Sequence, residues 1–370
     1  MNNNKKLYIA GIGLISAVGG NATMTAAAVE AGVSGYQLSN FISKSGKRIS
    51  MANIPDEVFY SMDIEIERNS TFKKQYEHII KMAIYALQDV FIDFKYQNSI
   101  TTKIPLILAF PESEPKIEQI SPKLFIKNVL KLSGVPVDEN KVHRIHGGRA
   151  AGLQCLDLAS RYLHDQNEDF VLVGGSDSYR SISLINNLEE QQRLLFEGQS
   201  DGFCPGEASC FLLLTRHSHL ALQKNDNIVA LHTLGKSEEK GHTGSELPYK
   251  GDGLDKAFKQ ALANFSVKPL DTVYSSMNGE SFWAKEYGVA MMRNKSCFSE
   301  SVIIQHPADC IGDVGCAMGS SLIALSALSL LKDNSSKGHL VYSSSDGVNR
   351  AAVIVEKLGR EKIAIERGER

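Results

Sequence analysis

Short, continuous apolar runs alternate along the chain with longer stretches in which apolar residues recur every three or four positions. Runs of the first kind, bounded by Gly, Pro, Asn, Asp or Ser, are typical of buried strands. They occupy 6–13, 104–110, 169–175, 207–215, 228–235, 271–277, 301–305, 339–347 and 350–357. A further short strand is predicted at 142–145.

The second kind of stretch has helical periodicity and occurs at 71–90, 122–133, 149–164, 253–264 and 313–332. In 71–90 one apolar stripe predicts a face packed on the core; it comprises Tyr76, Ile79, Ile80, Ala83, Leu87 and Val90. Strands that alternate with helices in this way predict a layered α/β fold.

A weak internal echo suggests duplication. "VLVGGSDS" (171–178) and "LVYSSSDG" (340–347) are both apolar runs that end in small residues and an aspartate. A duplicated βαβαβ unit would produce this pattern. The polar stretch 216–227 is the best join, so we predict an N-terminal half at 1–220 and a C-terminal half at 221–370.

Composition and charge exclude several classes of function. Hydrophobic residues make up 43% of the 370 positions and charged residues 22%, as in globular proteins with an ample core. The net charge of −2 gives no electrostatic case for nucleic acid or an anionic membrane surface. The six cysteines form no C-x-x-C pair or zinc spacing, so we expect buried structural thiols, a cytoplasmic location and no metal or cofactor.

The first residues, "MNNNKKLYIAGIGLISAVGG", resemble a signal peptide in their basic start and apolar centre. A buried strand that ends in a Gly-rich turn, followed by a helix over 21–32, is the favoured alternative. We expect no membrane span, because no stretch reaches the ~18 apolar residues that one needs.

Residues 143–155, "HRIHGGRAAGLQC", have the pattern of an active-site elbow: a strand, a Gly-Gly turn and a helix start. Such elbows hold nucleophiles, but the tip here is Arg149, which is not one. "GIGLISAVG" is not a dinucleotide fingerprint, because Ser16 stands where the third glycine belongs. "GGSDS" lacks the final glycine of a G-x-S-x-G elbow.

Several motifs together resemble the β-ketoacyl synthases of the thiolase fold. "LFEGQSDGFCPGEASCFLLLT" resembles the family's D-x-x-x-D-G-F-x-x-G-E segment, "DFVLVGGSDS" its V-x-x-G-G strand, and "CIGDVGCAMGSSLIALSAL" its H-x-x-G-A-A-G helix. The opening strand, turn and helix are similar too, which supports the buried strand over the signal peptide. The resemblance implies two βαβαβ halves in a five-layer αβαβα sandwich.

The family's catalysis needs a cysteine and two histidines, and the resemblance implies that none remains. The cysteine position falls on Arg149, the H-G-T histidine on Asn278 with Glu280 at the threonine, and the G-H-x-x-G histidine on Asp309. The lysine before that histidine falls on Ile304, and "SSDGVNR" replaces the closing G-F-G-G-T-N loop. Cys155 lies further along the helix on another face, and His146 and His306 are expected to be structural.

The replacement predicts a buried ion pair. A charged Arg149 at a helix N-terminus needs a partner, for which we expect Asp309 and, second, Glu280. The degenerate positions Arg149, Asn278 and Asp309 would then fill a site without catalytic residues.

Chain-length factors are family members of this kind: they pair with an active ketosynthase and close its acyl tunnel. The resemblance therefore implies a heterodimer that acts with acyl carrier protein, and the short chain is closest to the aryl polyene type. Segments 108–114 and 121–134 match the tunnel region, with Phe110, Phe125, Val129 and Leu130 as its predicted lining. Two alternatives remain open: an altered hydrolase or decarboxylase that uses Asp309 or His306, and a homodimeric acyl-binding scaffold.

Overall fold

The computed structural model describes residues 5–92, 94–95, 100, 102–112, 120–199, 201–263, 265–267, 269–332 and 336–359. Its main sheet has the strand order β11-β10-β12-β13-β8-β1-β7-β6-β4-β5, and β9 pairs with β13. The strands are β1 (Leu7–Ser16), β4 (Ile104–Phe110), β5 (Val137–His146), β6 (Phe170–Ser178), β7 (Glu207–Thr215), β8 (Ile228–Leu231), β9 (Gly235–Glu238), β10 (Leu270–Ser275), β11 (Phe298–Gln305), β12 (Gly338–Ser344) and β13 (Asn349–Leu358).

The same connection order occurs twice in this sheet. In the N-terminal part β4 is parallel to β5 and β6, and β7 is antiparallel to β6 and β1. In the C-terminal part β10 is parallel to β11 and β12, and β13 is antiparallel to β12 and β8. The two parts meet where β1 pairs with β8 through Leu7–Leu231 and Tyr8–Ala230. The polar stretch 216–227 lies between β7 and β8, and the boundary proposed within it stays a prediction.

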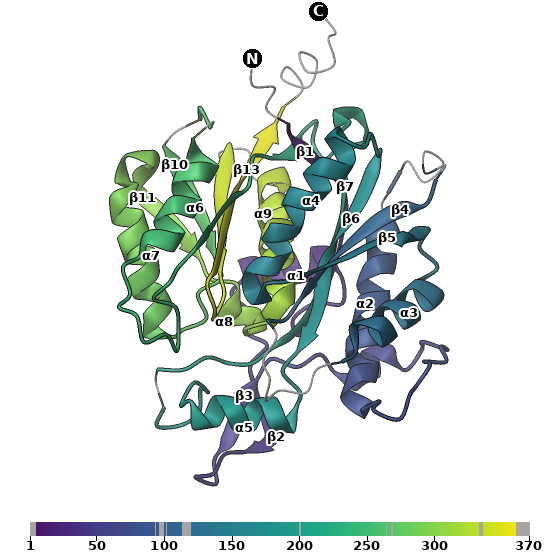
Figure 1. Cartoon of the computed structure of the whole chain (residues 1–370), viewed down its shortest axis with the longest axis vertical. Helices are drawn as coiled ribbons and strands as arrows, with labels where there is room; N and C mark the ends of the chain where they lie inside the picture. Colours follow the sequence, from purple (N-terminus) through teal and green to yellow (C-terminus); the bar gives the residue numbers. More distant parts are fainter. Residues whose placement is uncertain are drawn as a thin grey trace, which may run out of the picture.

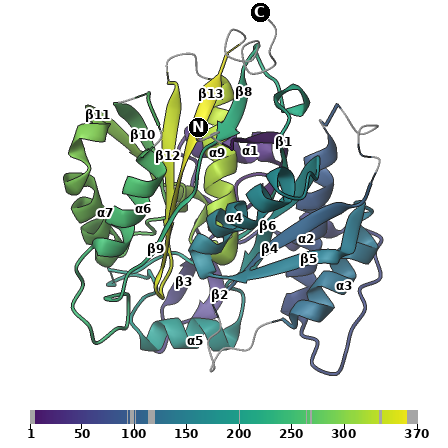
Figure 2. The same cartoon turned by 45° about the horizontal axis from the view of Figure 1, so that its top comes forward.

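Helices cover both faces of each part and also fill the space between them (Figure 1). They are α1 (Ala22–Glu30), α2 (Lys74–Ile92), α3 (Pro122–Ser133), α4 (Ala151–His164), α5 (Ile182–Glu190), α6 (Asp252–Leu262), α7 (Ser281–Arg293), α8 (Ala308–Ile311) and α9 (Met318–Lys332). Figure 2 shows α2 and α3 outside the N-terminal strands, α6 and α7 outside the C-terminal strands, and α4 and α9 between the two sets. The five-layer thiolase-like α/β fold is thus confirmed.

The middle layer is tight because glycines lie where α4 and α9 cross. A Cβ atom on Gly152 would lie 2.5 Å from the Ser320 amide nitrogen, and one on Gly319 would lie 2.8 Å from the Leu153 amide nitrogen. The side-chain-poor start of α9 therefore brings the two helix backbones into contact. This contact fixes the N-terminus of α4 against the loop that precedes α9. Arg149 lies in the short turn that leads into α4.

Most predicted elements are present, with shifted ends. β4, β7 and α3 have the predicted bounds, whereas the run at 228–235 divides into β8 and β9. β5 extends well before the predicted 142–145 because its polar N-terminal half lies at the sheet edge and needs no apolar pattern. The hairpin β2 (Gln37–Ile42) with β3 (Arg48–Met51) and helix α5 were not predicted. Residues 113–114 and 264 of the predicted segments lie outside the described residues.

The prediction that no stretch is apolar enough to span a membrane needs correction. The helical segment Gly315–Lys332 is long and apolar enough by length and composition. However, 83% of it is buried inside the protein, between the two sets of strands. A core helix passes the same test, so this segment is weak evidence for a span.

Candidate functional site

The predicted elbow is present, with Arg149 at its tip. β5 ends at His146, Gly147 and Gly148 turn the chain, and a short 3₁₀ turn over Gly148–Ala150 leads into α4. Gly148 has φ = +55°, and a Cβ atom there would also lie 3.2 Å from the Glu112 side chain. Only glycine suits both conditions, so the turn places residue 149 where the strand and the helix meet.

The Arg149 side chain is 4% exposed and uses each nitrogen. Nη1 donates to Asp313 Oδ2 and Nη2 to Asp346 Oδ1, both at 2.6 Å. Nε donates to the Ser344 carbonyl at 2.9 Å. The guanidinium carbon lies 4.4 Å from the ring centroid of Trp283, within the range of a cation–π contact.

A second arginine completes the cluster. Arg193, from the segment after α5, pairs with both oxygens of Glu280 at 2.6 and 2.8 Å. It also donates to both oxygens of Asp346, at 2.7 and 3.0 Å. Asp346 therefore joins the two guanidinium groups, a geometry that arginine's planar fork favours.

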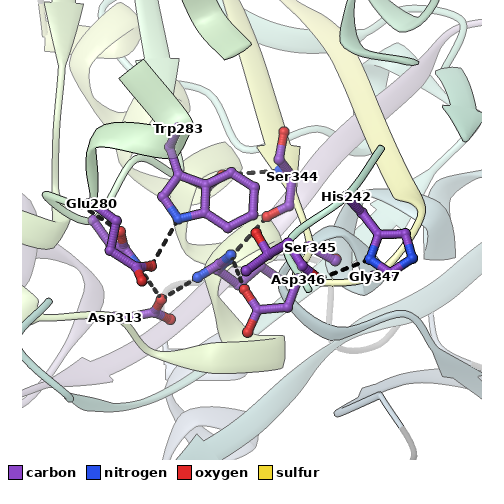
Figure 3. A network of polar contacts seen from close by, with 12 residues as sticks. His242, Glu280, Trp283, Asp313, Ser344, Ser345, Asp346 and Gly347 are labelled. Atoms are coloured by element: carbon purple, nitrogen blue, oxygen red, sulfur yellow. Dashed lines mark hydrogen bonds and ion pairs between the residues drawn. The ribbon is translucent and has the colours of Figure 1, made fainter. Parts of the chain in front are cut away.

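Asn278 and Trp283 close the remaining gaps. The Asn278 amide donates to Asp313 Oδ2 at 2.8 Å and to Glu280 Oε2 at 3.1 Å. The Trp283 indole nitrogen donates to Glu280 Oε2 at 2.9 Å. Figure 3 shows Glu280, Trp283, Asp313 and Asp346 turned toward one another, with the Ser344–Gly347 loop beside them. We call Arg149, Arg193, Asn278, Glu280, Trp283, Asp313 and Asp346 the arginine cluster.

Electrostatics hold the cluster in its charged form. Burial opposes the charge on Arg149, but Asp346 and Asp313 outweigh it and raise the pKa of the guanidinium above its ordinary value. Burial likewise opposes ionisation of Asp346, but Arg149 and Arg193 hold the pKa of this carboxyl well below its usual range. Two arginines and three acidic side chains are thus joined by ion pairs in one network, and such networks are costly when one member is removed.

A cavity adjoins the arginine cluster. Its volume is about 130 Å³, and Arg149, Arg193 and Asp346 form part of its wall. Asp177 lines it as well and accepts backbone hydrogen bonds from Cys316 at 2.8 Å and Ser178 at 2.9 Å. Burial raises the pKa of Asp177 to about 6, against these two bonds.

The structure brings most of the predicted degenerate positions together and excludes one. Arg149, Asn278 and Glu280 all belong to the cluster, although Glu280 pairs with Arg193 rather than with Arg149. The predicted Arg149–Asp309 ion pair is wrong. Asp309 is exposed on α8, and Asp313 takes its place.

The sequence contained a signal for Asp313. Setting the family's G-H-x-x-G-A-A-G pattern on Gly312 and Gly319 puts Asp313 at the histidine position, whereas the prediction aligned Gly312 with the motif's second glycine. No comparable signal identified Arg193, because it lies outside every motif. Asp346 stood inside the altered closing loop, but its role depended on where that loop folds.

The other potential catalytic side chains lie apart from the arginine cluster. His306 is half-buried near Asp309, and burial lowers its pKa. His146 is exposed, with its ring 5.3 Å from that of Phe110, and Ile304 is half-buried on β11. Cys316 lines the cavity, and its thiol donates to the Ala109 carbonyl at 3.3 Å. Burial raises the pKa of Cys155 and that of Cys316, so both side chains are held as thiols.

The four predicted tunnel residues divide into two pairs. Phe110 and Phe125 line the cavity, and their rings meet edge to face at 5.7 Å between centroids. Val129 is buried in the outer core between α2, α3 and the sheet, and Leu130 packs against that core while partly exposed. Only the phenylalanines are therefore placed to limit a ligand in this cavity.

The five-layer fold, with the elbow and cluster at its centre, is that of ketosynthases within the thiolase-like class. The ishigamide ketosynthase/chain length factor structure matches with a TM-score of 0.75 and 14% identity over 96% of this chain and 100% of that one. The structure of a ketosynthase in complex with its chain length factor from Xenorhabdus doucetiae matches with a TM-score of 0.70 and 16% identity, over 95% of this chain and 98% of that one. A chain in the structure of a type II polyketide synthase acyl-carrier protein in complex with its ketosynthase matches with a TM-score of 0.73 and 16% identity, over 96% of this chain and 100% of that one.

Sequence comparisons match parts of two polyketide synthases. The non-reducing polyketide synthase Dhc5 of Alternaria cinerariae is 24% identical over 148 residues, which is 38% of this chain and 7% of that enzyme. A highly reducing polyketide synthase of Eupenicillium brefeldianum is 29% identical over 134 residues, 34% of this chain and 6% of that enzyme. No family model matches the chain. These are distant relatives, and the chain spans a small fraction of their length.

Proposed function

We propose that this protein is a non-catalytic, chain-length-factor-like subunit that pairs with an active ketosynthase and shapes its acyl tunnel. The observation that carries the proposal is the arginine cluster. Condensation in the family needs a thiolate and two imidazoles. The resemblance, with the last motif shifted to begin at Gly312, puts Arg149, Asn278 and Asp313 at these positions, and Arg149 and Asn278 both contact Asp313. Their side chains are committed to ion pairs and hydrogen bonds, so they cannot form or accept an acyl thioester.

Strand β5 supports the pairing. It lies at one end of the sheet with a described neighbour only on the β4 side, and its side chains are largely exposed or half-buried. Such an edge offers backbone donors and acceptors to a strand of another chain. The proposal includes acyl carrier protein as the donor of the growing chain, and the aryl polyene type stays a prediction.

Co-expression with a Cys-His-His ketosynthase tests the proposal. We expect a stable 1:1 complex by native mass spectrometry, with acyl groups from acyl carrier protein found on the ketosynthase only. Arg149→Cys in this chain should create no condensation activity, because Asn278 and Asp313 still lack imidazoles. An acyl adduct on this chain would overturn the non-catalytic role. A homodimer that excludes every ketosynthase would favour an acyl-binding scaffold.

The altered-enzyme alternative has less support. Asp309 and His306 lie on and beside α8, outside the arginine cluster and the cavity lining. Hydrolysis or decarboxylation by these two residues would therefore need a different site. The same co-expression sample, assayed for release of free acid from acyl thioesters, distinguishes this alternative when Asp309→Asn is the comparison.

A further inference from the structure

The cavity beside the arginine cluster has an apolar wall and a polar end. The apolar wall comprises Tyr76, Ile79, Phe110, Phe125, Leu184 and Leu188. The polar end comprises Arg149, Arg193, Asp346, Asp177 and Glu112. These residues come from α2, α3 and α5, from the ends of β4 and β6, and from the segments that follow β4, β5, α5 and β12.

Each charged group at the polar end already has hydrogen-bond partners. Arg149 and Arg193, the cations among the described lining residues, are paired with Asp313, Asp346 and Glu280. Both oxygens of Asp177 accept backbone amides. The Glu112 carboxylate accepts hydrogen bonds from the Gly347 amide and the Asn349 side chain.

An anion that entered this cavity would therefore find no uncommitted cation. It would meet guanidinium groups that three carboxylates already neutralise, beside two further carboxyl groups. Moving an anion out of water without a new partner is costly, whereas an apolar segment gains from contact with the wall.

Size sets the length of the bound segment. A cavity of about 150 Å³ holds benzene, so about 130 Å³ suits a segment of about six heavy atoms. A longer ligand would extend out of the cavity, which is open on one side.

We propose that this cavity binds the end of a neutral, mainly apolar acyl chain and discriminates against chains of the same length that end in a negative charge. The inference rests on the proposed function, since the partner's growing chain would supply such an end. It assigns this subunit a binding site of its own, with a selectivity set by the closed charge network.

Two ligands of equal length test the selectivity: 1-hexanol and hexanoate. Ligand-detected NMR titration of the full, unpartnered chain at pH 7.5 should show 1-hexanol bound at least tenfold more tightly than hexanoate. Hexanoate that binds as tightly as 1-hexanol would overturn the inference. Undetectable binding of 1-hexanol at millimolar concentration would overturn it as well.

A matched pair of variants locates the binding. Leu184→Trp fills the cavity from a half-buried position and should abolish 1-hexanol binding. Leu247→Trp makes the same change at an exposed leucine outside the cavity and should leave the binding unchanged. Equal loss or equal retention in both variants would reject the cavity as the site. Because no ketosynthase is present, a failure here leaves the pairing proposal intact, and a failure to pair leaves this binding measurable.

Discussion

At the scale of single residues, the buried arginine at position 149 depends on side chains that are distant in the sequence. A buried arginine needs carboxylates, and Asp313 and Asp346 supply them from two other loops. Arg193 then balances Asp346 and brings in Glu280. The cluster therefore behaves as one unit, and removal of one member affects the others.

Arg149→Met should lower the free energy of unfolding by about 3–5 kcal/mol, because it leaves Asp313 buried without its cation. Arg149→Met combined with Asp313→Asn should be more stable than Arg149→Met alone, since the unpaired charge is gone. Urea denaturation of the full chain measures both. Asp309→Asn is the matched control at an exposed site and should change stability by no more than about 0.5 kcal/mol. A large loss of stability in Asp309→Asn, with no gain from adding Asp313→Asn to Arg149→Met, would support the Arg149–Asp309 pair predicted from the sequence.

Asp177 predicts a specific pH dependence. Its folded-state pKa of about 6 lies above the ordinary 3.8, so the folded protein holds the proton more tightly than the unfolded chain does. Its contribution to stability is therefore complete below pH 4 and is lost as the pH rises through 6, by roughly 3 kcal/mol at most. Relative to Asp177→Asn, the wild type should lose stability between pH 4 and 7. A difference that is flat across this range would show that Asp177 is not perturbed.

At the scale of elements, β4 and α3 bring two aromatic rings to the cavity. Phe110 ends β4 and Phe125 lies in the first turns of α3, and their edge-to-face contact forms one wall. Val129 follows one turn later in the same helix but lies in the outer core. Neighbouring turns of one helix thus lie in different surroundings, one at the cavity and one in the outer core.

Phe125→Leu should lengthen the products of the ketosynthase complex, because it shortens a side chain in the cavity wall with less disruption than Phe125→Ala. Phe110→Leu should act in the same direction. Val129→Ala is the control, since it removes core volume from the same helix without touching the cavity, and Leu130→Ala is a second one. Mass spectrometry of released products is the measurement. A shift with Val129→Ala but none with Phe125→Leu would reject the phenylalanine wall.

At the scale of the whole molecule, the open edge of β5 and the duplicated layers favour a partner. An obligate interface of this class buries more than about 2,000 Å². A partner that binds only the folded chain raises its apparent stability by mass action. The melting temperature of this chain should therefore rise when an active ketosynthase is added, and the rise should grow with ketosynthase concentration. Calorimetry at several ratios measures it, and a melting temperature independent of the ketosynthase would contradict pairing.

The sequence alone determined the class of fold and placed Arg149, which is not a nucleophile, at the tip of the elbow. Apolar runs and helical stripes depend on neighbouring residues, so 104–110, 122–133 and 207–215 were predicted with their observed bounds. The Gly147–Gly148 turn likewise indicated the place of Arg149. These features follow from local backbone conformation and burial, which short patterns record.

Only the tertiary structure decided what Arg149 contacts. Asp309 and Asp313 are four residues apart, and the turn between α8 and α9 makes one exposed and the other buried. Arg193 and Asp346 reach the site from segments with no motif for ion pairing. An ion pair depends on side-chain direction and distance in space, which sequence order does not specify, so the closed charge network and the selectivity inferred from it depend on the fold.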